Sequence, residues 1–269
     1  MTTGAPPDVT LVIAVYQRDD FLTLVLTSLL DQTLANFEVI VADDGSGPAI
    51  AEVIESFQGA FTHRIVHVRH EDDGFRKTII ANRAVACARG DLLVFIDGDC
   101  ILHHRFLERH YRRRRAGLVL SGRRVMFDRE LTERLATDDV RSRRIERAAF
   151  WWKHAGRIDR WNGFYLPLVH RARNFRRADY EIVGSNFSVH REDFFRVNGY
   201  DERIIGRGLE DNNLRARFLN SGIAVGTITR EALQYHLFHT ADPIPHSREV
   251  IDKYRWIGET RTPHGIDKG

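Results

Sequence analysis

The chain has 269 residues, 43% of them hydrophobic and 10% aromatic, and a formal net charge of +3 at pH 7. This composition is typical of a globular protein with a substantial core, in one large domain or two small ones. It excludes two classes: no apolar run approaches the roughly 20 residues of a membrane span, and Cys87 and Cys100 are too few for a disulfide scaffold. We expect a cytoplasmic protein without a secretory leader.

Strands and helices are predicted to alternate over the first hundred residues. Short apolar runs predict four strands, the third of them the most polar: Val9–Val15, Phe37–Ala42, His63–Val68 and Leu92–Ile96. The spacing of apolar residues predicts helices that begin near Asp19, run from Pro48 to about Phe57, and cover Phe75–Arg89. This alternation predicts a doubly wound, largely parallel sheet, whose loops after the first, second and fourth strands converge at one edge.

The rest of the chain is less regular. Helical patterns cover His103–Arg115, most of Asp128–Trp152, Arg191–Val197 and Glu210–Asn220. Apolar runs predict strands at Gly117–Met126, Glu181–His190 and Ile223–Thr229. The stretch from 153 to about 180 mixes aromatic and basic residues without a period, which predicts loops or a mobile lid.

Positive charge is concentrated in the middle of the chain. Residues 105–180 carry 21 Lys and Arg against 9 Asp and Glu, a balance of +12, so the rest of the chain carries −9. Aromatic side chains are interleaved with these cations: Trp151, Trp152, Trp161, Phe164 and Tyr165. Three interpretations stay open: a site for an anionic acceptor, peripheral contact with an anionic membrane surface, and a solvated helix face. Nucleic-acid binding through residues 105–177 is an alternative function, but no recognised nucleic-acid motif accompanies these arginines, and we expect no nucleic-acid partner.

Two carboxylates separated by one glycine follow the fourth predicted strand. Asp97 and Asp99 lie at its carboxyl end, where open α/β sheets bind ligands. Gly98 has no Cβ and lets a ligand or a metal approach the backbone closely. Because two close carboxylates repel each other, a divalent cation that also holds phosphate oxygens is the natural ligand. A solvated Asp-Gly-Asp turn is the alternative.

Several motifs together resemble those of family 2 glycosyltransferases of the GT-A fold. They are LVIAVYQR, VADDGS, GFRKTIIANRAVACARGDLLVFIDGDC and GSNFSVHREDFFRVNGYDERIIGRGLEDNNLRARFLNSG, which cover roughly half of the chain in the family's order. The last motif is similar to the galactosyltransferase-like segment of β-1,4-galactosyltransferases and chondroitin-type polymerases. The resemblance implies one doubly wound, mostly parallel Rossmann-like sheet. Residues 1–104 would bind the nucleotide-sugar, 105–180 would form a basic helical and loop segment, and 181–269 would complete the acceptor-binding and catalytic half.

The resemblance assigns donor binding to residues at the edge of this sheet: Ala14, Tyr16, Arg18, Asp44, Arg76, Asp97, Gly98 and Asp99. Asp44 would recognise uracil, because a buried carboxylate accepts strongly from an imide N–H. A helix-capping Asp in a turn is the alternative. Arg76 would contact the diphosphate, whereas Lys77 is expected to be a surface lysine. Asp97 would contact ribose or metal, and Asp99 would be the direct metal ligand.

The resemblance also assigns catalytic and metal-binding roles near the C-terminus. Asp211 would be the general base on the acceptor hydroxyl and Glu210 would hold sugar hydroxyls, with helix capping as the alternative. His236 and His239 follow the last predicted strand and are the candidates for the remaining metal ligand, with His239 preferred. The WGGED pattern of relatives stands here as Arg207-Gly208-Leu209-Glu210-Asp211, without the aromatic residue and one glycine, which leaves the donor sugar open.

The activity that the resemblance implies is metal-dependent, inverting transfer of a sugar from a UDP-sugar to a hydroxyl of a glycan, a lipid-linked sugar or a small molecule. Mn²⁺ is the expected cofactor and Mg²⁺ the alternative, because a mixed oxygen and imidazole site suits Mn²⁺. A nucleotidyltransferase is the alternative enzyme class. It usually has a glycine-rich phosphate loop after the first strand, and Tyr16-Gln17-Arg18-Asp19 contains no glycine. The acceptor, the linkage and the oligomeric state stay open.

Overall fold

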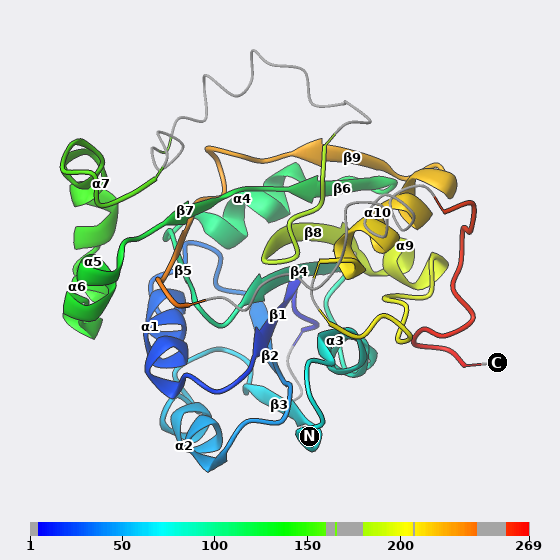
Figure 1. Ribbon diagram of the computed structural model, residues 1–269, viewed down its shortest axis with the longest axis horizontal. Coiled ribbons are helices and arrows are strands. Elements are labelled where there is room, and N and C mark those ends of the chain that lie inside the picture. The colour runs from blue at the N-terminus through cyan, green and yellow to red at the C-terminus, as the bar shows by residue number, and fades with distance from the viewer. Residues whose placement is uncertain (1–4, 160–164, 166–179, 207, 241–256, 269) are drawn as a thin grey trace.

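The computed structural model describes residues 5–159, 165, 180–206, 208–240 and 257–268, and its main feature is a seven-stranded sheet in the order β3-β2-β1-β4-β8-β6-β9 (Figure 1). The strands are β1 (Val9–Val15), β2 (Phe37–Asp43), β3 (Val66–Arg69), β4 (Leu92–Asp97), β6 (Leu118–Ser121), β8 (Asn186–His190) and β9 (Ala224–Thr227). Neighbouring strands run parallel, except that β8 runs antiparallel to both β4 and β6. The predicted mostly parallel, doubly wound α/β fold is confirmed.

Helices cover both faces of this sheet (Figure 1). One face packs against α1 (Asp19–Leu29), α2 (Pro48–Ser56) and α4 (Phe106–Arg113). The other face packs against α3 (Lys77–Ala86), α9 (Arg191–Arg196) and α10 (Glu210–Asn220). Strands that are buried on both faces are nearly continuous apolar runs, which makes β1, β2 and β4 recognisable in the sequence.

A second sheet of three strands was not predicted from the sequence. Its order is β5 (Cys100–Leu102), β10 (Gln234–His236) and β7 (Arg124–Met126), with β10 antiparallel to β5 and parallel to β7. Strands of three residues carry too little periodicity to be recognised. Because His236 lies within β10, the prediction that it follows the last strand is wrong.

The single strand predicted over Gly117–Met126 is two strands in two sheets. The chain leaves the large sheet after β6 and enters the small one at β7. Gly122 lies at this crossing, where a Cβ would come within 2.4 Å of the side-chain amide of Asn186. The remaining differences are at strand ends: β3 covers Val66–Arg69 instead of His63–Val68, and β8 begins at Asn186 instead of Glu181.

Three helices form an outer group at the margin of the molecule in Figure 1: α5 (Arg129–Arg134), α6 (Thr137–Arg141) and α7 (Arg144–His154). They confirm the helical prediction for 128–152. Their apolar side chains share a small core with α1 and the three-stranded sheet. The loop or lid predicted for 153–180 lies largely outside the described residues. Within the described parts of the chain, no helix combines the length and apolar character needed to cross a membrane.

Candidate active site

The loops that follow β1, β2 and β4 meet at one edge of the large sheet, as predicted. The parallel register sets Val15 opposite Asp43, and β4 pairs with β1 on its other side. Two backbone hydrogen bonds join the loops: the Asp44 N–H donates to the Val15 carbonyl and the Gly98 N–H to the Ala14 carbonyl, each over 2.8 Å. The donor-binding residues predicted at these strand ends are therefore brought together.

Gly98 has a packing reason to be glycine. A Cβ at this position would lie 2.9 Å from Cγ2 of Val15 and 3.3 Å from the Ala14 carbonyl oxygen. From the sequence, this glycine is expected to let a ligand or a metal approach the backbone. The structure adds that the loop between Asp97 and Asp99 presses against the end of β1.

Asp44 is buried, and both of its carboxylate oxygens are bonded. His70 Nε2 lies 2.6 Å from Oδ1, and the backbone N–H of Arg76 donates to Oδ2 over 3.0 Å. Burial raises the pKa of Asp44, although both bonds act against this shift. The Arg76 side chain pairs with Asp73 at 2.9 Å, and its buried Nε has no partner among the described residues. A nucleobase that contacts Asp44 would do so beside His70.

Tyr16 and Arg18 lie at the rim of the site. The Tyr16 side chain is 53% exposed, and its hydroxyl donates to Asp72 Oδ2 over 3.1 Å. Arg18 donates to both carboxylate oxygens of Asp20, over 2.9 and 2.7 Å, and its guanidinium carbon lies 3.3 Å from the ring centroid of Phe21. Both side chains reach the solvent at the edge where the strand loops meet.

Asp97, the last residue of β4, is paired with Lys77, the first residue of α3. Lys77 Nζ lies 2.5 Å from Asp97 Oδ1, and the lysine side chain is only 17% exposed. Burial by itself lowers the pKa of Lys77, but the carboxylates of Asp97, Asp211 and Glu210 raise it above its ordinary value. The prediction of a surface lysine is wrong. Lys77 is a fixed cation between the end of β4 and the start of α10.

Asp99, His236 and His239 bring three potential metal-ligand atoms together. Asp99 Oδ2 lies 3.1 Å from His236 Nε2 and 2.9 Å from His239 Nε2, and all three atoms lie within 4.8 Å of one another. Burial by itself raises the pKa of Asp99, but the bonds to the two histidines depress it well below its usual range. The strand pairing of β10 with β5 accounts for this meeting, because it sets His236 opposite Cys100.

This donor set fits a divalent cation. One carboxylate oxygen and two imidazole nitrogens lie close together, and Mn²⁺ accepts both ligand types. A bound cation would replace the present bonds of Asp99 to the two histidines. Asp97 is not a member of this cluster, since Lys77 holds its Oδ1. The geometry therefore groups Asp99 with both histidines and leaves Asp97 outside this group.

Asp211 and Glu210 occupy the first turn of α10. The backbone N–H of Gly184 donates to Asp211 Oδ2 over 2.8 Å. Burial and the neighbouring Glu210 carboxylate raise the pKa of Asp211 to about 7, while Lys77 acts in the opposite direction. Glu210 is buried, and its Oε2 has no hydrogen-bond partner among the described residues. A carboxylate with a pKa near the working pH is suited to general base catalysis.

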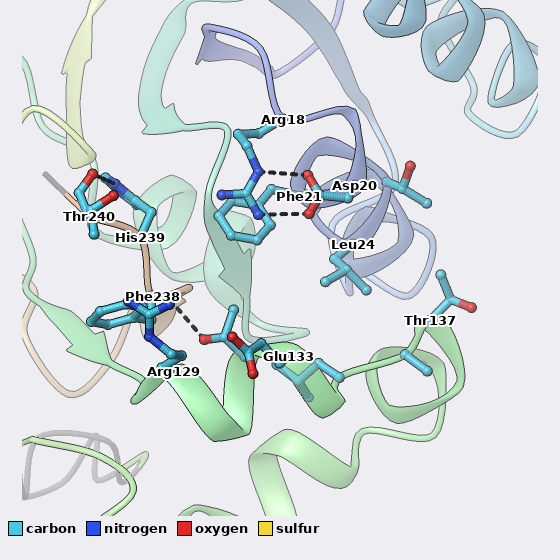
Figure 2. A pocket seen from close by; sticks show the side chains of 14 residues that line it. Arg18, Asp20, Phe21, Leu24, Arg129, Glu133, Thr137, Phe238, His239 and Thr240 are labelled. Carbon is cyan, nitrogen blue, oxygen red and sulfur yellow. Dashed lines mark hydrogen bonds and ion pairs between the residues drawn. The ribbon is translucent and has the colours of Figure 1, made fainter.

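A cavity of about 550 Å³ opens beside His239 (Figure 2). Figure 2 shows Arg18 and Phe21 on one wall, and Phe238 with Arg129 on another. The other lining residues are Asp20, Thr23, Leu24, Thr132, Glu133, Leu135, Ala136, Thr137, His239 and Thr240. The cavity lies beside α1, whereas Asp211 belongs to α10 on the opposite face of the sheet. Of the candidate metal ligands only His239 lines it, and neither Asp211 nor Glu210 does.

A second cluster, His103, His104 and Glu146, also offers ligand atoms close together. Glu146 Oε2 lies 2.7 Å from His104 Nδ1 and 3.5 Å from His103 Nε2. Burial and the nearby cations, among them Arg105 and Arg143, lower the pKa of His103 to about 3. The same positive surroundings oppose a metal cation. This cluster instead ties α7 to the start of α4.

Some predicted residues cannot be placed, and some partners were missed. Arg207, Trp161 and Phe164 lie outside the described residues. His70 and Gly184 were not proposed as site residues, although a signal for His70 exists. It follows β3, the strand beside β2, so the rule that placed Asp44 at the sheet edge also applies to His70.

Comparisons with known proteins show what this chain is similar to. It matches the family model described as Glycosyl transferase family 2 over residues 10–187, and the one described as N-terminal domain of galactosyltransferase over residues 168–240. Similar curated proteins include validoxylamine A glucosyltransferase of Streptomyces hygroscopicus subsp. limoneus, 28% identical over 246 residues, and chondroitin synthase of Escherichia coli, 24% identical over 246 residues. The alignments cover 86% and 84% of this chain, but only 51% and 34% of the two relatives.

Two solved structures share the fold at low sequence identity. TarS of S. aureus has a TM-score of 0.60 at 14% identity, over 86% of this chain and 37% of that chain. The mannosyltransferase PcManGT of Pyrobaculum calidifontis, solved with GDP-Man and Mn²⁺, has a TM-score of 0.59 at 15% identity, over 88% of this chain and 60% of that chain. Both are GT-A glycosyltransferases, so the fold predicted from the sequence is confirmed.

Proposed function

Because this chain belongs to glycosyl transferase family 2, whose model matches residues 10–187, we propose that it is a metal-dependent, inverting transferase that uses a UDP-sugar. Glycosyl transfer from a nucleotide-sugar to an acceptor follows from the family and the fold. The observation that carries the finer proposal is the meeting of Asp99, His236 and His239 within 4.8 Å at the end of β4. The family match speaks against the two alternatives, a nucleotidyltransferase and a nucleic-acid-binding protein.

Uridine recognition is assigned to Asp44 and the rim beside it. The buried carboxylate accepts a hydrogen bond from the imide N–H of uracil, next to His70. Tyr16 offers an exposed ring beside the same loops, and Asp97 is available to the ribose hydroxyls through Oδ2. Arg76 supplies a guanidinium for the diphosphate.

Asp99, His236 and His239 would hold the divalent cation, which supplies positive charge for the phosphate oxygens of the leaving nucleoside diphosphate. Mn²⁺ suits this mixed donor set, and Mg²⁺ is the alternative. Both imidazoles lie within hydrogen-bond distance of the same Asp99 oxygen, which holds the three side chains together. The site is therefore preorganised for its ligand.

Asp211 acts as the general base. Gly184 holds its Oδ2, which directs Oδ1 to the acceptor hydroxyl. As the acceptor oxygen attacks the anomeric carbon, the bond from that carbon to the diphosphate oxygen breaks, and the hydroxyl proton passes to Asp211. The nucleoside diphosphate leaves with the bonding electron pair. Attack from the side opposite the leaving group inverts the anomeric configuration. Glu210, one residue earlier in the same turn, is placed to hold a sugar hydroxyl.

A panel of nucleotide sugars tests the donor proposal. Thermal shift is measured for UDP-, GDP- and dTDP-sugars with and without Mn²⁺, because a ligand that binds only the folded state raises its stability. We expect UDP-sugars to give the largest shift, and only with the metal. The Asp99→Asn variant is the control and should lose the metal-dependent part. A GDP-sugar preference would overturn the uridine assignment, and a shift without metal would overturn metal dependence.

The released product separates the two enzyme classes. Glycosyl transfer from a UDP-sugar releases UDP, whereas nucleotidyl transfer from UTP to a sugar phosphate releases pyrophosphate. We expect UDP alone.

A cytoplasmic location stays part of the proposal, supported by Cys87 and Cys100, which are both free thiols in the structure.

A further inference from the structure

Helix α7 presents two different faces along its length. Its inner face is fixed to the protein: Ile145 and Ala149 are buried, and the Trp152 ring lies edge-on to Phe127 with centroids 5.7 Å apart. Glu146 is turned inward as well, where it bonds to His104 at 2.7 Å. The inner face therefore fixes the position of the helix, and with it the position of the side chains on its outer face.

The outer face of α7 is aromatic and basic. Phe150 and Trp151 are 45% and 70% exposed, unusually high values for such large apolar side chains. Arg143, Arg147 and His154 are exposed beside them. Residues 141–157 contain six Lys or Arg and one acidic residue, Glu146, which faces inward.

The charge of this surface is not neutralised by the protein itself. Arg144 pairs with Asp139, but no acidic side chain among the described residues pairs with Arg143 or Arg147. Arg147 donates instead to the backbone carbonyl of Ser142. Figure 1 shows α7 at the margin of the molecule, beyond α1 and the sheets. The helix therefore lies at the periphery of the described structure.

We propose that the outer face of α7 docks the enzyme on an anionic phospholipid bilayer. Aromatic side chains settle at the boundary between headgroups and acyl chains, and arginines beside them are attracted to a negative surface. A helix at the periphery can meet a flat, deformable surface with its exposed face. Proteins that bind single-stranded nucleic acid usually stack its bases on aromatic side chains along a basic groove. Two of the aromatic residues that are interleaved with the basic residues in the sequence do not belong to this surface. Trp152 packs inward against Phe127, and Tyr165 stacks on His103.

Vesicle flotation tests the proposal with the full chain. The probes are vesicles of phosphatidylcholine alone and vesicles with about one-third phosphatidylserine, at low and high salt. We expect binding only to the anionic vesicles and release at high salt, because screening weakens surface attraction. Binding is measured without turnover, so the result does not depend on the proposed donor or base.

Two double variants and two controls locate the surface. Phe150→Ser with Trp151→Ser, and Arg143→Gln with Arg147→Gln, should each weaken vesicle binding on the order of tenfold or more. The controls are Ile205→Ser, whose side chain is 62% exposed elsewhere, and Arg64→Gln with Arg83→Gln, which removes two exposed arginines from other elements. Both controls should bind like the wild type. All variants should keep the wild-type circular dichroism spectrum and thermal unfolding midpoint. These measurements need no nucleotide or metal, so they show that the variants are folded and keep failure here distinct from failure of the proposed function.

Three outcomes would overturn the proposal. The first is no binding to anionic vesicles at low salt, and the second is wild-type binding by both double variants. The third is that the surface serves another partner. In that case the protein does not bind vesicles, but it retains single-stranded RNA on filters or forms a dimer in solution, and the α7 variants lose this property. RNA retention would assign the surface to nucleic acid, and a dimer would assign it to a second copy of the chain.

Discussion

Lys77 Nζ lies 2.5 Å from Asp97 Oδ1, and this ion pair links the end of β4 to the carboxylates at the start of α10. Lys77 also lowers the pKa of Asp211, which burial and Glu210 raise to about 7. One cation thus interacts with Asp97, with the candidate base Asp211 and with its neighbour Glu210. Its charge sets the pH at which the base becomes available.

Replacing Lys77 by Met should move the pH dependence of catalysis. Without the cation, the pKa of Asp211 rises further, so the rising limb of kcat/KM against pH shifts to higher pH. Lys77→Arg keeps the charge and should keep the wild-type midpoint, even if its activity is lower. Rates from pH 5.5 to 9 in the three proteins provide the measurement. The same midpoint in the Met and Arg variants would contradict a role for the charge.

Asp211→Asn should lower turnover on the order of 10²-fold or more, the usual scale for a general base, while UDP binding is retained. The amide is nearly isosteric with the carboxyl group but cannot take up a proton. Steady-state rates and UDP affinity, measured together, separate this result from misfolding. Turnover at the wild-type level would move the base elsewhere, with Glu210 as the first candidate.

The same variant should be more stable than the wild type at alkaline pH. The pKa of Asp211 is raised from 3.8 to about 7, so the folded state holds a proton that the unfolded state has released. This contribution to stability is complete below pH 3.8 and is lost as the pH rises through about 7. The Asn amide does not titrate, so the variant does not lose this stability as the pH rises. We expect a Tm gain of roughly a few degrees at pH 8 and a smaller one at pH 5. An equal gain at both pH values would show that Asp211 does not titrate in this range.

The strand ends that meet at the site could be predicted from the sequence, but the side-chain contacts within the site could not. β1, β2 and β4 are nearly continuous apolar runs, and the rule for parallel strand ends then places Asp44, Asp97 and Asp99 at one edge. The distance between Asp99 and His236 could not be predicted, because it depends on the pairing of β10 with β5, and each has only three residues. The burial of Lys77 was missed for a related reason, because it also depends on residues that are distant in the sequence. The carboxylates of Asp97, Glu210 and Asp211 act on Lys77 from β4 and α10, which no local pattern encodes.

His236→Ala and His239→Ala should each raise the Mn²⁺ concentration needed for UDP binding. Their Nε2 atoms lie 3.1 and 2.9 Å from the same oxygen of Asp99, so the geometry gives no preference for His239. The increase should be at least on the order of tenfold, since even outer-shell partners of metal sites have effects of that size. Calorimetric titration of UDP at several Mn²⁺ concentrations provides the measurement.

His264→Ala removes an exposed histidine away from the site and is the control for these two variants. It should keep the wild-type Mn²⁺ requirement. If only His239→Ala changes the requirement, His236 is a structural residue of β10. If neither variant does, histidine is not part of the metal site.

Gly184→Ala should reduce turnover while leaving the fold intact. An alanine Cβ would lie 2.5 Å from Asp211 Oδ1 and 2.7 Å from Oδ2, so the carboxylate must move away from the Gly184 N–H that holds it. The obstacle is the end of a side chain and not backbone, so the protein can yield locally and the loss of stability should be small. Gly258→Ala is the matched control, because nothing lies within 4 Å of its Cβ position. We expect a loss of turnover on the order of tenfold or more for Gly184→Ala, with unchanged UDP affinity, since displacing a general base forfeits part of its contribution. Kinetics and thermal unfolding of both variants provide the measurement. Full activity in Gly184→Ala would mean that the position of Asp211 does not limit the reaction.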